Sequence, residues 1–527
     1  MPRKHTPVPL IDLFAGPGGL GEGFAAWRDS GRRAFKSALS IEMEASAHQT
    51  LRLRSFYRQF PDAQAPEDYY RYLRGEITLA QLYDRNPVEA ERAHEEAWCI
   101  ELCEKNLGVI RTRIDHALAD ADPWVLLGGP PCQPFSLAGR SRNRKGTRYS
   151  DGKETRHELY VEYLQIIADF WPAVFVMENV RGLLSARFNG QRMFDRIAED
   201  LRDPAKAISD AAGRGRRHTR RKHTYRLFPV AAPATDISSG NLFGEPDFLV
   251  RCERHGIPQA RHRLILLGVR DDIGVEPNTL QCRQMVPARY VLDGLPKLRS
   301  GLSREDSDHA WRSFILSARD MSWLTELNRR DVKVYRHIKS AIRQLVKPTH
   351  DKGADFVSET PKIHRTMRNW FLDPRLNGVC NHQSRGHMAT DLHRYLFTAC
   401  FGEIHNRSAT LADFPEGLLP DHKNATPDRK QNAPFADRFR VQLADLPSTT
   451  IVSHIAKDGH YYIHPDPTQC RSLTVREAAR LQTFPDNYRF VGNRTAQYHQ
   501  VGNAVPPLLA HQIADIVYDL IQRSGLS

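Results

Sequence analysis

The chain lacks several features that mark common protein classes. No window approaches the roughly 20 consecutive apolar residues of a membrane span, and the N-terminus has no long apolar segment typical of a signal peptide. The eight cysteines form no C-x-x-C pair and show no disulfide-like spacing, which argues against a zinc cluster and a secreted framework. We therefore expect a soluble, cytoplasmic protein without a metal centre.

The composition indicates a large, basic globular protein. Its 527 residues exceed the roughly 100–200 residues of one ordinary domain, so two or more domains are expected. A hydrophobic share of 40% is enough to form buried cores. The net charge of +13 and isoelectric point near 9.4 favour a polyanionic substrate or partner over a merely basic surface.

The N-terminal half alternates strand-like and helix-like segments, which predicts an α/β fold with a parallel sheet. The predicted strands are 8–14, 36–42, 124–129, 173–180 and 263–270, and the predicted helices are 19–27, 45–56 and 157–170. An apolar helix at 507–522 is expected to pack against this sheet.

Two insertions interrupt the alternation, and it ends after Arg270. Residues from about 57 to 106 are predicted to be an inserted helical segment, with Cys99 and Cys103 on one helix face as small core residues. The run 213–223 is strongly basic and is either a phosphate-binding segment or a disordered insertion. The change of pattern after Arg270 predicts a domain boundary.

A glycine-rich turn follows the first predicted strand. Gly16, Gly18 and Gly21 satisfy G-x-G-x-x-G, and Glu42 ends the next strand, where a carboxylate can bind a ribose. The following helix N-terminus favours an anionic group. This pattern alone leaves open an NAD site, a methyl-donor site and a structural turn.

A cysteine lies on a rigid turn after the third predicted strand, in GGPPCQPFS (128–136). Pro130 and Pro131 restrict the backbone before Cys132, as suits a nucleophile better than an inert core thiol. The segment 136–158 that follows is basic and rich in glycine, and we expect it to close over a phosphate backbone.

These motifs resemble, in order, those of DNA (cytosine-5) methyltransferases of the bacterial restriction-modification type. The resemblance covers segments 12–24, 128–136, 174–184, 256–270, 471–486 and 500–507. It implies a Rossmann-like S-adenosylmethionine-dependent sheet with helices on both faces and a smaller, irregular target-recognition domain. It also implies methylation of carbon 5 of a cytosine within a specific duplex sequence.

The resemblance implies roles for four catalytic residues. Cys132 would add to carbon 6 of the base, and Glu178 would hydrogen-bond or protonate ring nitrogen 3. Arg261 and Arg263, predicted to share one strand face, would hold the base carbonyl oxygen; the alternatives are phosphate contacts for the arginines and an exposed strand-end carboxylate for Glu178.

The resemblance also implies a cofactor pocket. Glu42 would bind the ribose, Met43 would lie against adenine in place of the tryptophan of some relatives, and Asp115 would lie near the adenine amino group. The complete predicted set is Phe14, Gly16, Gly18, Gly19, Leu20, Glu42, Met43, Asp115, Leu159 and Asn503.

The implied organisation is a catalytic domain at 1–270 with a basic insertion at about 205–246, a target-recognition domain at 271–494, and a C-terminal segment, 495–527, that returns to the catalytic domain. Because a stacked base is inaccessible, the target cytosine would be flipped out. The segment NHQSRGHM from Asn381 is expected to help read base edges. Thr474 and Glu477 predict a capping box on a scaffolding helix.

The expected partner is double-stranded DNA, with a cognate restriction endonuclease acting separately and the enzyme itself a nucleoid-associated bacterial monomer. An orphan DNA methyltransferase and a tRNA cytosine-5 methyltransferase remain alternatives. An NAD-type oxidoreductase and a catalytically silent DNA-binding protein are weaker ones.

Overall fold

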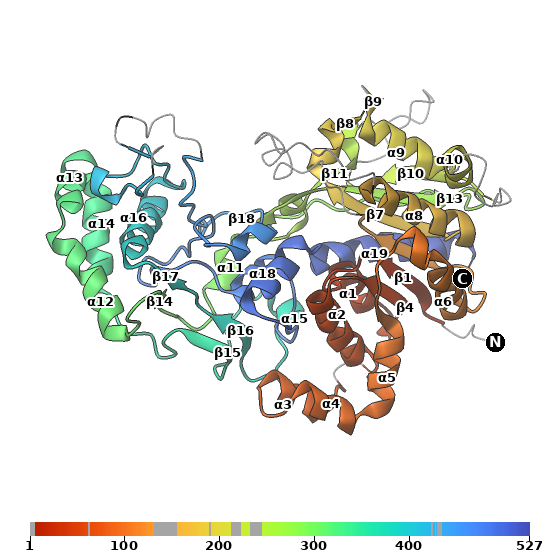
Figure 1. Cartoon of the computed structure of the whole chain (residues 1–527), viewed down its shortest axis with the longest axis horizontal. Coiled ribbons are helices and arrows are strands. Elements are labelled where there is room, and N and C mark those ends of the chain that lie inside the picture. Colours follow the sequence, from red (N-terminus) through yellow and green to blue (C-terminus); the bar gives the residue numbers. More distant parts are fainter. Residues whose placement is uncertain are drawn as a thin grey trace.

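The computed structural model divides into two lobes (Figure 1). It describes residues 6–61, 64–130, 155–188, 191–211, 223–231, 245–422, 425–426, 428 and 435–526. Cys132 and most of the basic run 213–223 lie outside these residues. Among the helices in the described ranges, none has the length and apolarity needed to cross a membrane.

The lobe on the right of Figure 1, called the sheet lobe, is built on a mainly parallel sheet. The strands, in spatial order, are β10 (Tyr225–Pro229), β13 (His262–Arg270), β7 (Val174–Val180), β6 (Val125–Gly128), β1 (Val8–Leu13), β4 (Phe35–Glu42) and β5 (Ala97–Cys99), with β11 (Leu249–Arg251) also paired to β13. The pairs from β7 to β5 are parallel, whereas β13 is antiparallel to β7 and to β10. The predicted α/β class is confirmed.

Helices cover both faces of this sheet. Val125 and Leu127 of β6 pack with helices on one face, and Leu126 between them packs with helices on the other. The first face carries α1 (Gly19–Ala26) and α19 (Pro507–Ser524), and the second carries α6 (Leu107–Leu118), α8 (Thr155–Phe170), α9 (Met193–Arg202) and α10 (Pro204–Ala211). The predicted packing of the C-terminal helix against the first sheet is thus confirmed.

The predicted helical insertion is only partly helical. It contains α3 (Glu67–Leu73), α4 (Leu79–Arg85) and α5 (Pro87–Glu96), which follow α2 (Ala45–Arg58). Its end is β5, the edge strand, so the prediction that Cys99 and Cys103 share a helix face is wrong. A strand of three residues is too short to show the alternation of apolar and polar residues by which a strand is predicted, and this one directly follows a glutamate-rich helix.

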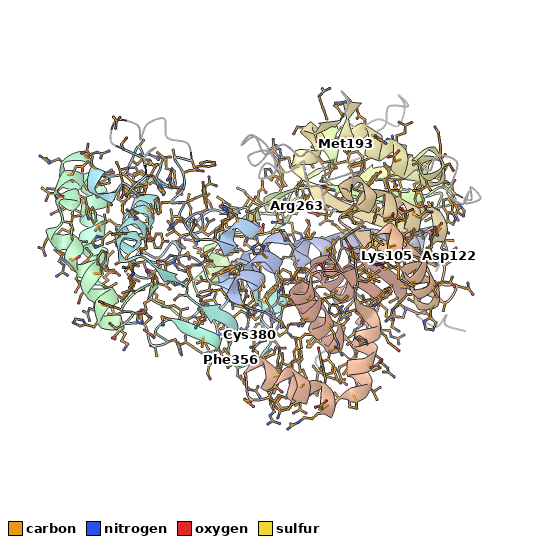
Figure 2. All side chains as sticks on the ribbon, in the orientation of Figure 1. Lys105, Asp122, Met193, Arg263, Phe356 and Cys380 are labelled. Carbon is orange, nitrogen blue, oxygen red and sulfur yellow. The ribbon has the colours of Figure 1, made fainter. Side chains whose placement is uncertain are left out.

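The insertion connects the sheet lobe to the second half of the chain. The hydroxyl of Tyr70 donates to Oδ2 of Asp373 at 2.8 Å, and Nδ2 of Asn487 donates to the same oxygen at 2.8 Å. Arg54 of α2 donates to Asn487 at 3.1 Å and pairs with Glu22 of α1. Phe356 and Cys380, labelled in Figure 2, lie in the apolar cluster that also contains the buried residues of α3. A buried polar chain thus runs from α1 to Asp373.

The lobe on the left of Figure 1, called the helical lobe, packs four helices around one apolar core. They are α12 (Asp308–Ser317), α13 (Ser322–Arg330), α14 (Val332–Arg343) and α16 (Ala389–His405). Short elements between the lobes are α11 (Arg289–Leu292), β14 (Gly301–Leu302), β15 (Gly353–Val357), α15 (Arg368–Phe371), β16 (Val379–Gln383), β17 (Gly386–His387) and β18 (Ser448–Thr449).

A buried scaffold joins the lobes around α17 (Val475–Leu481) and α18 (Arg494–Asn503). Thr474 accepts a hydrogen bond from the amide of Glu477 at 3.2 Å, and the Glu477 carboxylate accepts from the amide of Thr474 at 2.7 Å. The predicted capping box is confirmed. Arg471 donates twice to the same carboxylate, so this buried charge is fully paired.

Candidate active site

Several of the predicted site residues lie at one edge of the sheet. The parallel strands β1, β4, β5, β6 and β7 all end there, because their crossover helices return the chain to the opposite edge. Two groups follow these strand ends: a glycine-rich turn after β1, called the cofactor turn (Phe14–Gly19), and an ion pair beside the end of β6.

The glycines of the cofactor turn serve different purposes. Gly16 has φ of 57°, and a Cβ there would meet nothing within 4 Å, so this residue borders open space. Gly18 has φ of 95°. A Cβ on Gly19 would lie 2.3 Å from the carbonyl oxygen of Val505, so Gly19 permits close packing of the C-terminal segment. Phe14 also adopts a left-handed conformation, with φ of 59°.

Glu42 closes the turn from the neighbouring strand. Its Oε2 accepts a hydrogen bond from the amide of Gly16 at 2.8 Å, and Oε1 accepts from the amide of Glu44 at 2.7 Å. Burial raises the pKa of this carboxyl group. The next residue, Met43, is 57% exposed at the rim, where the Cys99 thiol approaches its carbonyl oxygen. The structure therefore brings Gly16, Glu42 and Met43 together.

Asp12 of β1 lies beneath this turn and was not predicted as a site residue. It is 1% exposed, and within the described ranges neither carboxylate oxygen makes a well-aligned hydrogen bond. Burial raises its pKa to about 7, against the opposing effect of Arg58. A Cβ on Gly21 would lie 3.0 Å from Oδ2. The only signal in the sequence is one acid within an otherwise apolar strand.

The other predicted cofactor residues are more dispersed. Leu20 is buried in α1, Leu159 is half-buried in α8, and Asn503 is exposed at the end of α18. Asp115 is exposed in the last turns of α6, which carries the chain from the end of β5 back toward the start of β6. The structure therefore does not bring Asp115 to the edge of the sheet that carries the cofactor turn. The residue at that edge, at the end of β5, is Cys99.

An ion pair lies beside the end of β6. Nε of Arg263 is 2.6 Å from Oε1 of Glu178, and the side chains are 11% and 14% exposed. Glu178 lies in β7 and Arg263 in the adjacent antiparallel strand β13. Figure 2 shows Arg263 on the side of the sheet lobe that faces the helical lobe.

The segment before Cys132 approaches this pair directly. A Cβ on Gly129 would lie 3.2 Å from Oε2 of Glu178, and the carbonyl of Pro130 accepts a hydrogen bond from Nδ2 of Asn179 at 3.1 Å. Cys132 follows two residues later and lies outside the described residues. The described chain thus leads to Cys132 from a point beside the Glu178 carboxylate.

Arg261 is placed differently from its predicted partner. It lies between β12 (Gln259–Ala260) and β13 rather than within a strand, and its side chain is fully buried. Its guanidinium donates to the carbonyls of Ile451 at 2.6 Å, Ala504 at 2.7 Å and Gly502 at 3.3 Å. Burial, then the charge of Arg263, lowers its pKa to about 9, which leaves it charged at neutral pH.

Most polar side chains of the segment NHQSRGHM are buried, although Gln383 is exposed. Asn381 is bonded to the backbone of Phe490, and His382 bonds to Thr474 and Pro296. Arg385 donates to the carbonyls of Ile455 and Lys457. Asn381, His382 and Arg385 are at most 7% exposed, so the expectation that these three read base edges is wrong, and they stabilise the scaffold instead.

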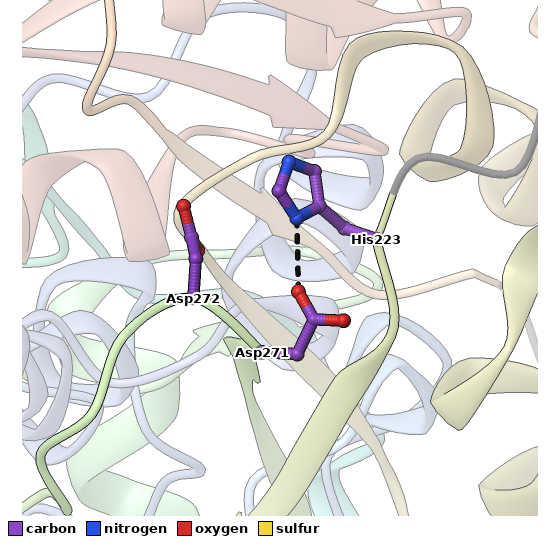
Figure 3. A group of neighbouring side chains, drawn as sticks. All are labelled: His223, Asp271 and Asp272. Atoms are coloured by element: carbon purple, nitrogen blue, oxygen red, sulfur yellow. Dashed lines mark hydrogen bonds and ion pairs between the residues drawn. The ribbon is translucent and has the colours of Figure 1, made fainter.

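Three groups with metal-ligand chemistry cluster at the opposite end of β13 (Figure 3). Ligand atoms of His223, Asp271 and Asp272 lie within 4.8 Å of one another. Asp271 accepts from His223 and Thr224, and Asp272 accepts twice from Arg270. Both carboxylates are already paired with protein groups, so the cluster serves to anchor the end of the strand.

Comparison with known proteins places these motifs in one family. The family model for C-5 cytosine-specific DNA methylase matches residues 74–204 and 248–518. The type II methyltransferase M.Bpa9945I of Bacillus paralicheniformis is 32% identical, over 97% of this chain and 99% of its own. The type II methyltransferase M.AgeI of Thalassovita gelatinovora is 27% identical, over 96% and 98%. The chain therefore belongs to the C-5 cytosine-specific DNA methylases, which transfer a methyl group from S-adenosylmethionine to carbon 5 of cytosine in DNA.

Proposed function

We propose that Cys132 is the nucleophile of this methyl transfer, and that Glu178 and Arg263 hold the target base against it. The observation that carries this proposal is the ion pair of Glu178 and Arg263 directly beside Gly129 and Pro130. Two steps of about 3.8 Å between consecutive Cα atoms keep Cys132 close to Pro130. A thiol in that position can reach a base bound by the pair.

The chemistry follows from the weak nucleophilicity of cytosine carbon 5. Addition of the Cys132 thiolate to carbon 6 makes carbon 5 electron-rich, and Glu178 stabilises the positive charge of a protonated ring nitrogen 3. Bound S-adenosylmethionine supplies the electrophilic methyl group. Loss of the carbon 5 proton and elimination of the thiolate then restore the aromatic ring and free Cys132.

We assign different roles to the two arginines. Arg263 contacts Glu178 and can hold the base carbonyl oxygen, so it is proposed as a catalytic residue. Arg261 donates to three backbone carbonyls from two separate segments, which supports a positioning role. It would hold Ile451 and the segment after α18 against the site.

The chain supports an S-adenosylmethionine pocket around the cofactor turn. Gly16 borders open space, and Glu42 presents a carboxylate beside it that can accept from the ribose hydroxyls. Phe14, Gly18, Gly19, Leu20, Met43, Leu159 and Asn503 complete the proposed pocket. Asp115 is left out, because its helix leads away from this edge.

The wider biological role is proposed on the same basis. The substrate is a specific sequence in duplex DNA, from which the cytosine is flipped into the site of residues 1–270, while residues 271–494 recognise the sequence and 495–527 complete the catalytic domain. The relatives named type II methyltransferases support a part in restriction-modification, with a separate cognate endonuclease. We propose a monomer that acts in the bacterial cytoplasm, on the nucleoid.

The nucleophile is tested by removing its thiol. Cys132→Ala should abolish transfer of labelled methyl groups to DNA and retain S-adenosylmethionine binding by calorimetry. The matched control is Cys282→Ala, since Cys282 is exposed and lies elsewhere. Methyl transfer by Cys132→Ala at the rate of the control would exclude this mechanism.

A covalent trap tests the same step independently. DNA containing 5-fluorocytosine should form a stable adduct with the wild type, because fluorine cannot leave carbon 5 as a proton does. Peptide mapping should locate the adduct at Cys132. Parallel assays on tRNA and bisulfite sequencing of host DNA distinguish a DNA enzyme from a tRNA enzyme and reveal the target sequence.

A further inference from the structure

One helix of the helical lobe presents an uninterrupted row of cations. The exposed face of α14 carries Lys333, Arg336, Lys339 and Arg343, and we call these four residues the α14 cationic face. Their spacings of three and four residues place them in line along the helix. Residues 332–350 contain no aspartate or glutamate. The row is therefore purely cationic.

This face points away from the core of the helical lobe. The buried residues of α14, among them Val334 and Ile338, pack in the cluster that contains α16. At 100° per residue, the four cations lie on the opposite side of the helix. The α14 cationic face thus points away from the core of the helical lobe.

Among the described residues, some surface cations of the same lobe are paired with carboxylates, whereas the four residues of the α14 cationic face, like Arg312, Arg319 and Arg329, are not. Arg330 pairs with Glu326 at 2.7 Å, Arg407 with Asp413 at 2.7 Å and Lys347 with Asp308 at 3.0 Å. Within the described part of the chain, no carboxylate pairs with any member of the α14 cationic face. Neighbouring like charges destabilise a helix, so an external anion bound to this face would reduce the repulsion between the four cations.

We propose that the α14 cationic face binds the phosphate backbone of the DNA that flanks the methylation site. From Lys333 to Arg343 the helix rises about 15 Å, which equals the length along the duplex axis of about four base pairs at roughly 3.4 Å each. Contacts of this kind add affinity without reading sequence. The proposal rests on the proposed function, because it assumes a duplex already held by the catalytic lobe.

The test is a variant that removes all four charges and keeps the helix: Lys333→Gln, Arg336→Gln, Lys339→Gln and Arg343→Gln. Dissociation constants are measured over a range of salt on a duplex of about 15 base pairs and one of about 60, both with the methylation site. On the long duplex the slope of log affinity against log salt should fall by about 2–4. On the short duplex affinity and methylation rate should stay at wild-type values.

A matched control removes four exposed cations of the sheet lobe: Lys36→Gln, Arg92→Gln, Lys105→Gln and Lys206→Gln, with Lys105 labelled in Figure 2. It loses the same net charge and should retain the wild-type slope on the long duplex. The double variant Arg336→Lys, Arg343→Lys keeps the charge and should also retain it. Thermal melting shows that each variant is folded.

Three outcomes would overturn the proposal: a wild-type slope in the fourfold variant, an equal loss in the control, or an equal loss on both duplex lengths. Methylation of the short duplex by the wild type tests the proposed function separately. Failure there would contradict the proposed function. Failure confined to the long-duplex measurement would contradict only the binding of flanking DNA.

Discussion

Nε of Arg263 lies 2.6 Å from Oε1 of Glu178, across two antiparallel strands at the edge of an otherwise parallel sheet. The pair is almost excluded from solvent, so each charge depends on the other for its orientation. β7 and β13 fix both backbones, which leaves little freedom to the side chains. Such preorganisation is what stabilisation of a developing charge requires.

Glu178→Gln should lower the methylation rate by about 10²–10⁴-fold, since the amide cannot balance the charge of a protonated base. The variant should bind S-adenosylmethionine as the wild type does. Initial rates with labelled cofactor provide the measurement. The control is Glu253→Gln, which alters the nearby hydrogen bond between Glu253 and His262. Equal losses in both variants would show that the Glu178 effect is structural.

Arg261→Met should lower the stability of the folded protein more than it lowers the rate of methyl transfer. It leaves the carbonyls of Ile451, Gly502 and Ala504 buried without their donor, a cost of about 3 kcal/mol in the free energy of unfolding. Arg263→Met should lower the rate more than the stability. Urea unfolding and initial rates on both variants separate the two roles. The reverse pattern would make Arg261 the catalytic arginine.

Gly16→Ala and Gly19→Ala should impair the enzyme in different ways, the first by weakening cofactor binding and the second by destabilising the fold. At Gly19 the new Cβ would lie 2.3 Å from the Val505 carbonyl, so the protein should lose about 1–3 kcal/mol of stability. At Gly16 the Cβ meets no protein atom within 4 Å but enters the proposed pocket, so S-adenosylmethionine affinity should fall at least about tenfold. Thermal melting and calorimetry distinguish the two, and normal cofactor affinity in Gly16→Ala would remove Gly16 from the pocket.

Asp12 should make the stability of the ligand-free enzyme fall as pH rises. Its pKa is about 7 in the folded chain, against 3.8 for an ordinary aspartate, so between these values the folded state holds a proton that the unfolded state has released. Stability is therefore lost as pH rises from about 4 to 7, by at most about 4 kcal/mol. Asp12→Asn should remove this decline in urea unfolding measured from pH 4 to 8. An unchanged pH profile in the variant would contradict the assignment.

Tyr70→Phe tests whether the insertion braces the two halves of the chain. Loss of the hydrogen bond to Asp373 should cost about 1–2 kcal/mol of stability and raise the KM for DNA more than it changes kcat. The control is Tyr83→Phe in the same insertion, because the described residues offer the Tyr83 hydroxyl no partner. A double-mutant cycle with Asp373→Asn should give a coupling of about 1 kcal/mol. A coupling energy of zero between Tyr70 and Asp373 would contradict the proposal that the insertion stabilises the contact between the two halves of the chain.

The periodic parts of the chain could be predicted, because the central strands β1, β6 and β7 are covered on both faces and are mainly apolar. Residues 8–14, 124–129 and 173–180 all correspond to observed strands. The capping box at Thr474 was also predictable, since its hydrogen bonds form within one turn. Local patterns sufficed where local contacts decide the structure.

The features that could not be predicted depend on contacts between residues far apart in the sequence. Nothing near Arg261 reveals that carbonyls of Ile451 and Ala504 would surround it, and nothing near Asn381 reveals burial against Phe490. Polar residues in a variable region suggest base reading, yet Asn381, His382 and Arg385 hydrogen-bond backbone carbonyls of the scaffold. The prediction put Asp115 in the cofactor pocket, but the order of the strands places its helix away from the edge that carries the cofactor turn. The spacing of residues along the chain does not reveal that order.

The cofactor turn is completed by the far end of the chain. The hydroxyl of Tyr488 donates to the carbonyl of Pro17, 471 residues earlier, and Val505 lies against Gly19. At roughly 5–20 residues per second, a ribosome needs about 25–95 seconds to produce the second partner after the first. A growing or prematurely terminated polypeptide therefore has no finished site, and DNA modification begins only once synthesis of the chain has passed these last contacts.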